Sequence, residues 1–130
     1  MPAMKILKKV QNKISEFNER CEIQKEGALH FLDIQSIMDV DLYQAREIDF
    51  FFYSKKKKNA FNLKSTLEQK GYSVEEIYHN KENEFSICGT ARINSLDETE
   101  FLNWVEKMNE YAFIYNCLFD GWGMIGRLES

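Results

Sequence analysis

The spacing of apolar residues changes along this chain, and each change marks an expected element. From Met4 to about Glu19, apolar residues recur every three or four positions, a period that places them on one side of a helix. The residues of this stripe are Leu7, Val10, Ile14 and Phe17. From Cys21 to Gln44 neither a helical nor a strand period fits, and Gly27 is expected to separate this stretch from the first helix. The pattern therefore predicts an amphipathic N-terminal helix followed by a segment of undetermined structure.

Regular alternation begins at Arg46. The sequence REIDFFFYS, residues 46–54, is rich in aromatic and branched residues and predicts a strand. Its alternation places Ile48, Phe50 and Phe52 on one face and Asp49, Phe51 and Tyr53 on the other. The four lysines at 55–58 are expected to precede the next helix, because lysines in a first turn oppose the helix dipole. That helix is predicted from about Asn59, which can cap it, to a stop at Gly71.

The second half of the chain repeats the alternation of strand and helix. YSVEEIYHN and EFSICGTARI, residues 72–80 and 84–93, predict two strands of a hairpin. SLDE then predicts a helix capped by Ser95, with Glu98 completing a capping box, and residues 116–125 predict the last strand. The order β, α, β, β, α, β predicts an α+β fold. We expect a ferredoxin-like sandwich, a four-stranded antiparallel sheet with two helices on one face, preceded by the extra N-terminal helix.

The second face of this sheet is expected to need cover. Phe51 and Tyr53 would point there if Phe50 and Phe52 face the helices, and large exposed apolar patches are unusual on a monomer. The simplest cover is the N-terminal helix, and an intermolecular partner is the alternative. We expect one domain overall, with residues 1–45 as a helical extension packed on a ferredoxin-like domain of residues 46–130.

Composition and charge argue against several classes of function. The formal net charge of −4 gives no attraction to nucleic acid or anionic membranes, and no run approaches the roughly 20 apolar residues of a membrane span. Three cysteines without CxxC spacing or a secretory signal indicate free thiols in the cytoplasm. His30 and His79 have no metal-ligand spacing, and no nucleophile and base converge. We expect a protein that is not an enzyme and has no cofactor or metal.

The lysine run beside FFFY leaves an RNA-binding module as an alternative of another class. RNA recognition modules share the βαββαβ order and stack bases on aromatic residues of the sheet. Their third-strand signature begins with a basic residue and glycine and carries spaced aromatics. Residues 84–93 contain one aromatic, Phe85. A solvated loop is therefore the favoured role for the lysines.

The sequence LFDGWGM, residues 118–124, places two glycines inside the last predicted strand. Glycine weakens a strand and typically marks a bulge or the close approach of another element. Regular alternation puts Phe119, Gly121 and Gly123 on one face and Asp120, Trp122 and Met124 on the other. The glycines are expected to admit a close neighbour, while Trp122 spreads over the opposite face.

FDGWG at 119–123, with IDFFFY at 48–53 and LEQKGYSV at 67–74, resembles the family of the regulator of ribonuclease activity B, the protein inhibitors of ribonuclease E. The resemblance spans about residues 46–125. It implies a ferredoxin-like fold and a non-enzymatic regulator that inhibits a ribonuclease by protein–protein contact. An immunity protein that neutralises a nuclease toxin is an alternative within the same class.

The candidate partner-binding residues are Phe51, Tyr53, Asp120 and Trp122. If the partner is a nuclease, an acidic surface could compete with the phosphate backbone of its RNA. The expected partner is thus a ribonuclease or a nuclease toxin, with neither a membrane nor nucleic acid favoured.

Overall fold

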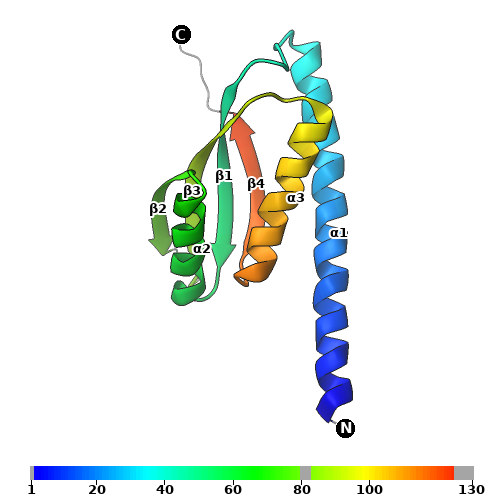
Figure 1. The fold of residues 1–130 in the computed structure, drawn as a ribbon, viewed down its shortest axis with the longest axis vertical. Coiled ribbons are helices and arrows are strands. Elements are labelled where there is room, and N and C mark those ends of the chain that lie inside the picture. The colour runs from blue at the N-terminus through cyan, green and yellow to red at the C-terminus, as the bar shows by residue number, and fades with distance from the viewer. Residues whose placement is uncertain (1, 80–82, 125–130) are drawn as a thin grey trace.

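The computed structural model describes residues 2–79 and 83–124 and contains one sheet with three helices (Figure 1). In chain order the elements are α1 (Pro2–Ile37), β1 (Arg46–Ser54), α2 (Lys57–Gln69), β2 (Ser73–His79), β3 (Phe85–Ile93), α3 (Glu98–Ile114) and β4 (Leu118–Met124). The sheet order is β2-β3-β1-β4, with every neighbouring pair antiparallel. This is the ferredoxin-like α+β arrangement predicted from the sequence. Residues 80–82 of the predicted hairpin and Ile125 of the last predicted strand lie outside the described residues.

The core lies between the sheet and the helices α2 and α3. Ile48, Phe50 and Phe52 alternate along β1 and are almost completely buried on the helix side. The helices contribute a matching set of buried residues: Ala60, Leu63 and Leu67 from α2, and Phe101, Trp104, Val105, Met108 and Ala112 from α3. The alternate residues of β1 therefore pack against the residues that recur every three or four positions in α2 and α3, as the sequence indicated.

Both helix starts differ from the predicted caps. The N-cap of α3 is Asp97, whose side chain accepts a bond from the Glu100 amide, whereas Ser95 donates to the Glu100 carboxylate at 3.0 Å. Helix α2 begins at Lys57, and Lys56 occupies its N-cap without a side-chain cap bond. Ser54 fixes that start because its hydroxyl accepts a bond from the Lys56 amide at 3.2 Å. Two of the four lysines therefore lie inside the helix.

Helix α1 is one continuous element of 36 residues, about 54 Å long. Gly27 lies inside it and does not end it. A glycine costs a helix interior about 1 kcal/mol, and packing of the neighbouring Ala28, which is fully buried, outweighs that cost. The spacing of apolar residues could not predict that α1 continues past Gly27. The positions that pack within residues 21–37 include Cys21 and the polar Gln24, which weaken the helical pattern.

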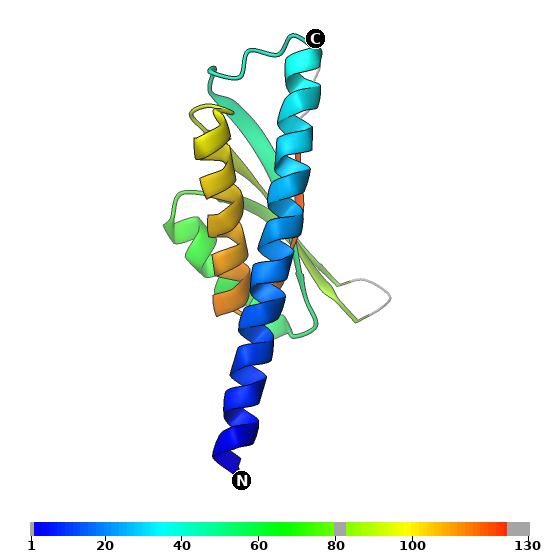
Figure 2. The same cartoon turned by 90° about the vertical axis from the view of Figure 1, so that its right-hand side faces the viewer.

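Helix α1 does not cover the second face of the sheet, contrary to expectation. It packs along α3, where ring centroids of Phe31 and Phe101 lie 5.4 Å apart, and it lies beside the outer edge of β4 (Figures 1 and 2). Arg20 and Gln24 donate bonds of 2.6 and 2.7 Å to the carbonyl oxygen of Phe119. An edge strand presents unpaired carbonyls, and these two side chains satisfy one of them. None of the described helices covers the opposite face of the sheet.

Strand β4 contains a bulge that changes which side chains share a face. Phe52 pairs with Phe119, Phe51 pairs with Gly121, and the register shifts between these pairs, which leaves Asp120 as the extra residue. Phe119 and Trp122 therefore both face the helices, because the extra residue of the bulge moves every later residue of β4 to the face opposite the one that simple alternation predicts. The prediction that they lie on opposite faces was wrong.

The glycines of this motif do not admit a close neighbour either. A side-chain carbon at Gly121 or Gly123 would meet no atom within 4 Å. Gly121 is needed for its backbone, since its φ of +128° is a conformation that other L-residues rarely adopt.

Gly121→Ala is expected to lower the free energy of unfolding by about 2 kcal/mol, the cost of a non-glycine residue in such a conformation. Gly123→Ala is the matched control, because it adds the same methyl group without positive φ and should change stability by less than about 1 kcal/mol. Urea unfolding of both variants measures the difference. Equal effects would show that the backbone of Gly121 is not the constraint.

Candidate protein-binding face

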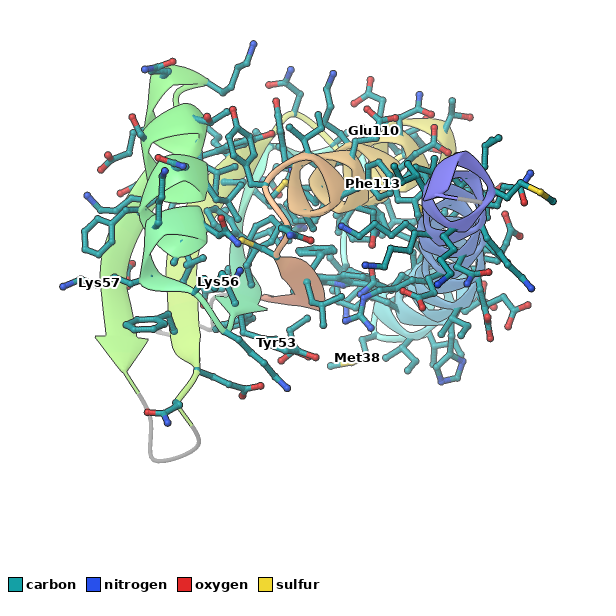
Figure 3. The ribbon with its side chains drawn as sticks, turned by 90° about the horizontal axis from the view of Figure 1, so that it is seen from below. Met38, Tyr53, Lys56, Lys57, Glu110 and Phe113 are labelled. Carbon is teal, nitrogen blue, oxygen red and sulfur yellow. The ribbon has the colours of Figure 1, made fainter. Side chains whose placement is uncertain are left out.

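The face of the sheet turned away from α2 and α3, here called the open face, carries none of the helices that the structure describes (Figures 1 and 3). Its described side chains come from all four strands. They are Glu47, Asp49, Phe51 and Tyr53 of β1, Ser73 and Glu75 of β2, Ser86, Cys88, Thr90 and Arg92 of β3, and Leu118 and Asp120 of β4. Three of the four predicted partner-binding residues, Phe51, Tyr53 and Asp120, are therefore brought together here.

Phe51 stands near the centre of the open face. It lies opposite Cys88 on β3 and Gly121 on β4, and 38% of its surface is exposed. Gly121 has no side chain to cover the ring from the β4 side. Tyr53, half-buried, follows two residues later between Ser86 and Leu118, and Figure 3 shows it on the side of the sheet away from the helices. The two rings form an accessible aromatic row along β1.

Carboxylates surround this row. Asp120 is exposed at the bulge beside Gly121, and both residues of a bulge project toward the side of the residue that they oppose, here Phe51. Across the sheet, the Thr90 hydroxyl lies 3.2 Å from Asp49 Oδ1 and 3.3 Å from Glu75 Oε1. The Thr90 hydroxyl has a single proton, so it donates to one of these two carboxylates at a time. The described open face carries four carboxylates, Glu47, Asp49, Glu75 and Asp120, and one cation, Arg92.

Trp122 is the predicted site residue that lies elsewhere. Its ring packs edge-on against Phe31 of α1 and Phe101 of α3, with centroids 6.0 and 5.4 Å away, and it stacks on Phe119. It therefore joins α1, α3 and β4 on the helix side of the sheet. The bulge at Asp120 separates it from the other three candidates.

The lysine run lies at one end of this surface. Lys55 and Lys56 line a shallow pocket of about 300 Å³ with Tyr53, Asn59 and Leu118, and Lys57 lies over the Phe61 ring at 5.7 Å. Figure 3 shows Lys56 and Lys57 beside the start of α2. The sheet surface on which an RNA module would stack bases is acidic, which opposes a phosphate backbone.

Cys21 and Cys117 do not have the properties of reactive thiols. Burial raises the pKa of the Cys117 thiol to about 11, and burial also raises the pKa of Cys21. Both thiols stay protonated at neutral pH and are poor nucleophiles. Within residues 2–79 and 83–124, no group of three His, Cys, Asp or Glu side chains could hold a metal ion.

Comparison with known families adds the deciding observation. Residues 37–124, about two thirds of the chain, match the family described as regulator of ribonuclease activity B. The chain belongs to this family. The match begins at the end of α1 and covers the whole sheet with α2 and α3, so the open face is part of the family's own unit. No curated protein matches the chain.

Membership of the regulator of ribonuclease activity B family implies that the chain takes part in the regulation of ribonuclease activity. The helices within the described ranges of this family member are not long and apolar enough to cross a membrane.

Sequence reasoning missed Glu75, which the alternation of β2 alone could not assign. The register of β2 on β3 shifts between Val74 and Glu76, so only the pairing places Glu75 beside Thr90. Asp49 carried a usable signal, because it shares the alternate positions of Phe51 and Tyr53.

Proposed function

We propose that this chain regulates a ribonuclease without catalysis, by direct contact between the open face and the nuclease. The observation that carries the proposal is the accessible Phe51 ring on a sheet face that α1 leaves uncovered. Aromatic anchors within a polar rim are typical of protein interfaces. Family membership supplies the class of target, a ribonuclease.

The charges of the open face support a mechanism of competition. A ribonuclease must present cations to the phosphates of its RNA, and the carboxylates of Asp49, Glu75 and Asp120 offer those cations another anionic partner. The fixed spacing of the carboxylates on three strands holds them in place before contact, which lowers the entropy lost on binding. The bound chain would then exclude RNA from the nuclease.

We test this with ribonuclease E, the target that the family resemblance implies, and a labelled single-stranded RNA. Phe51→Asp is expected to raise the inhibition constant about 30-fold or more, because losing an interface anchor costs about 2 kcal/mol or more. Phe61→Asp is the matched control, since Phe61 is similarly exposed, at 47%, but lies on α2. It should leave the inhibition constant within about threefold. Circular dichroism checks that both variants keep the fold.

Equal inhibition by the two variants would overturn the role of the open face. Direct binding of the RNA to the chain, with a steep loss of affinity as salt rises, would instead support the RNA-binding alternative. If ribonuclease E is unaffected, the same pair of variants can be tested against a toxin nuclease, which separates an immunity role from regulation of ribonuclease E.

We also propose that residues 1–45 are an accessory to the sandwich of residues 46–130, within one domain overall. The family match starts near the end of α1, and α1 packs on α3 through Phe17, Phe31 and the Lys25–Glu106 ion pair.

A further inference from the structure

Residues 4–14 of α1 extend past the end of the domain (Figures 1 and 2). Their apolar side chains are Met4, Ile6, Leu7, Val10 and Ile14, and each is between 46% and 68% exposed. We call this segment the protruding helix. The described part of the chain offers it no packing partner comparable to α3, whose last residue is Ile114.

The protruding helix continues an interface that the rest of α1 already makes. Positions 7, 10, 14, 17, 21, 24, 28 and 31 are separated by three or four residues, the spacing of a helix–helix seam. The later positions contact α3: Phe17 lies 5.2 Å from Phe113 between ring centroids, and Gln24 bonds Asn109 at 2.5 Å. Leu7, Val10 and Ile14 therefore repeat the same seam beyond the point where α3 stops. The seam has room for another helix there.

The charge of the protruding helix differs from that of the whole chain. It carries Lys5, Lys8, Lys9 and Lys13 and no Asp or Glu. The chain has 17 basic and 21 acidic residues, so the remainder has 13 against 21, a net charge of −8. Three of the lysines, Lys5, Lys8 and Lys9, lie on the side of the helix away from the seam, and Lys13 lies at its margin. A strongly basic apolar helix thus projects from an acidic protein.

A cavity of about 120 Å³ lies at the base of the protruding helix, where α1, α3 and the start of β4 meet. Its charged lining residues are Lys13, Glu16 and Arg20, and Figure 3 shows Phe113, which also lines it, between α3 and α1. Arg20 Nη2 donates to Phe119, but its buried Nε has no acceptor among the described residues. A carboxylate entering this cavity would meet the unused Arg20 donor and the Lys13 ammonium, which also donates to Asn116 Oδ1 at 3.3 Å, and these two cations outnumber the single carboxylate of Glu16.

We propose that the protruding helix docks an acidic amphipathic helix of another protein. The partner's apolar residues would pack on Leu7, Val10 and Ile14, which takes over the role that α3 has further along α1. Its carboxylates would lie against Lys13, and one could enter the cavity beside Arg20. The surface is separate from the open face, so this docking is distinct from the proposed contact with a ribonuclease.

Charge and shape favour this occupant over two others. A second copy of the protruding helix would bring eight lysines together without a carboxylate between them, and like charges oppose association. A flat anionic bilayer could attract the lysines, but Val10 and Ile14 face the same side as the α3-packed seam. A bilayer that met them would collide with the end of the domain (Figure 2).

The test uses the full chain and a labelled three-heptad helical peptide with leucine at positions a and d and glutamate at e and g. We expect binding by fluorescence anisotropy that weakens as salt rises. Leu7→Asp combined with Val10→Asp should weaken it at least tenfold, and Lys13→Glu, which reverses the charge at the margin of the seam, should weaken it about threefold or more. The matched control is Ile23→Asp with Ile34→Asp, two exposed residues of α1 on the side away from α3, which should change binding less than twofold.

Three results would overturn the proposal: no binding of the acidic peptide, equal binding of a peptide with lysine at e and g, or a chain that dimerises until Leu7 and Val10 are replaced. Phosphatidylserine vesicles form a further arm, and binding to them through the same residues without peptide binding would assign the helix to a membrane surface instead. The Leu7→Asp and Val10→Asp variant should inhibit ribonuclease normally, and Phe51→Asp should bind the peptide normally. The two proposals can therefore fail independently.

Discussion

Phe101→Ala is expected to lower the free energy of unfolding by about 4 kcal/mol, the typical cost of removing a buried aromatic ring. Phe101 is completely buried on α3 and contacts Phe31, Trp104 and Trp122 with ring centroids 5.4 to 5.7 Å away. It therefore joins α1, α3 and β4 at one point. Its loss leaves a cavity that three elements would have to move to fill, so little of the cost can be recovered by relaxation.

The control for this change is Phe113→Ala on the same helix. Phe113 also contacts a phenylalanine of α1, Phe17, but 43% of its surface is exposed. Its removal should cost about 1 kcal/mol, because solvent already reaches the ring. Urea unfolding of both variants gives the comparison. A Phe113→Ala effect as large as that of Phe101→Ala would mean that the α1–α3 seam, rather than the junction at Phe101, holds the structure together.

Gly89→Ala is expected to destabilise the protein by about 3 kcal/mol, at the upper end of the usual cost of overpacking. Gly89 pairs with Phe50 in the centre of the sheet, and an added carbon would lie 2.4 Å from both the Phe50 ring and the carbonyl oxygen of Ser73. Neither can move easily, because Phe50 is completely buried and Ser73 belongs to the backbone of β2. The sheet or the core would have to shift.

The same substitution at Gly27 should have the opposite sign. Gly27 lies in the middle of α1, and an added carbon there meets nothing within 4 Å. Gly27→Ala should raise the free energy of unfolding by up to about 1 kcal/mol, because alanine is the better helix former. Thermal and urea unfolding of the two variants checks both signs. Destabilisation by Gly27→Ala would indicate that α1 is not continuous through this position.

The sequence predicted the sheet and its helices because their patterns were local. Alternation along residues 46–54 correctly assigned Phe50 to the core and Phe51 to the open face, and that assignment supplied two of the candidate site residues. Alternation could not predict which face of the sheet a side chain occupies after a bulge interrupts the strand. Trp122 was misplaced because an extra residue at Asp120 shifts every later position by one, and nothing in a window of alternation reports that shift.

The position of α1 was unpredictable for a different reason. Its apolar stripe shows that one side of the helix packs against something, but the stripe does not name the surface. Arg20 and Gln24 decide the outcome by bonding the exposed edge of β4 at Phe119, a tertiary contact between residues about 95 positions apart. Because α1 lies at that edge, it leaves the open face exposed. The candidate site therefore depends on where α1 packs, although α1 contributes no residue to it.

The bulge in β4 also limits how the length of this strand can vary in related proteins. Phe119 and Trp122 are three positions apart, yet both rings reach the same core. Deleting one residue between them, or inserting one, would turn Trp122 out toward solvent and expose the contacts that join α1 to the sheet. Sequence alignments of relatives should therefore place no gap between these two aromatic residues, and an alignment that does so has the wrong pairing for the final strand.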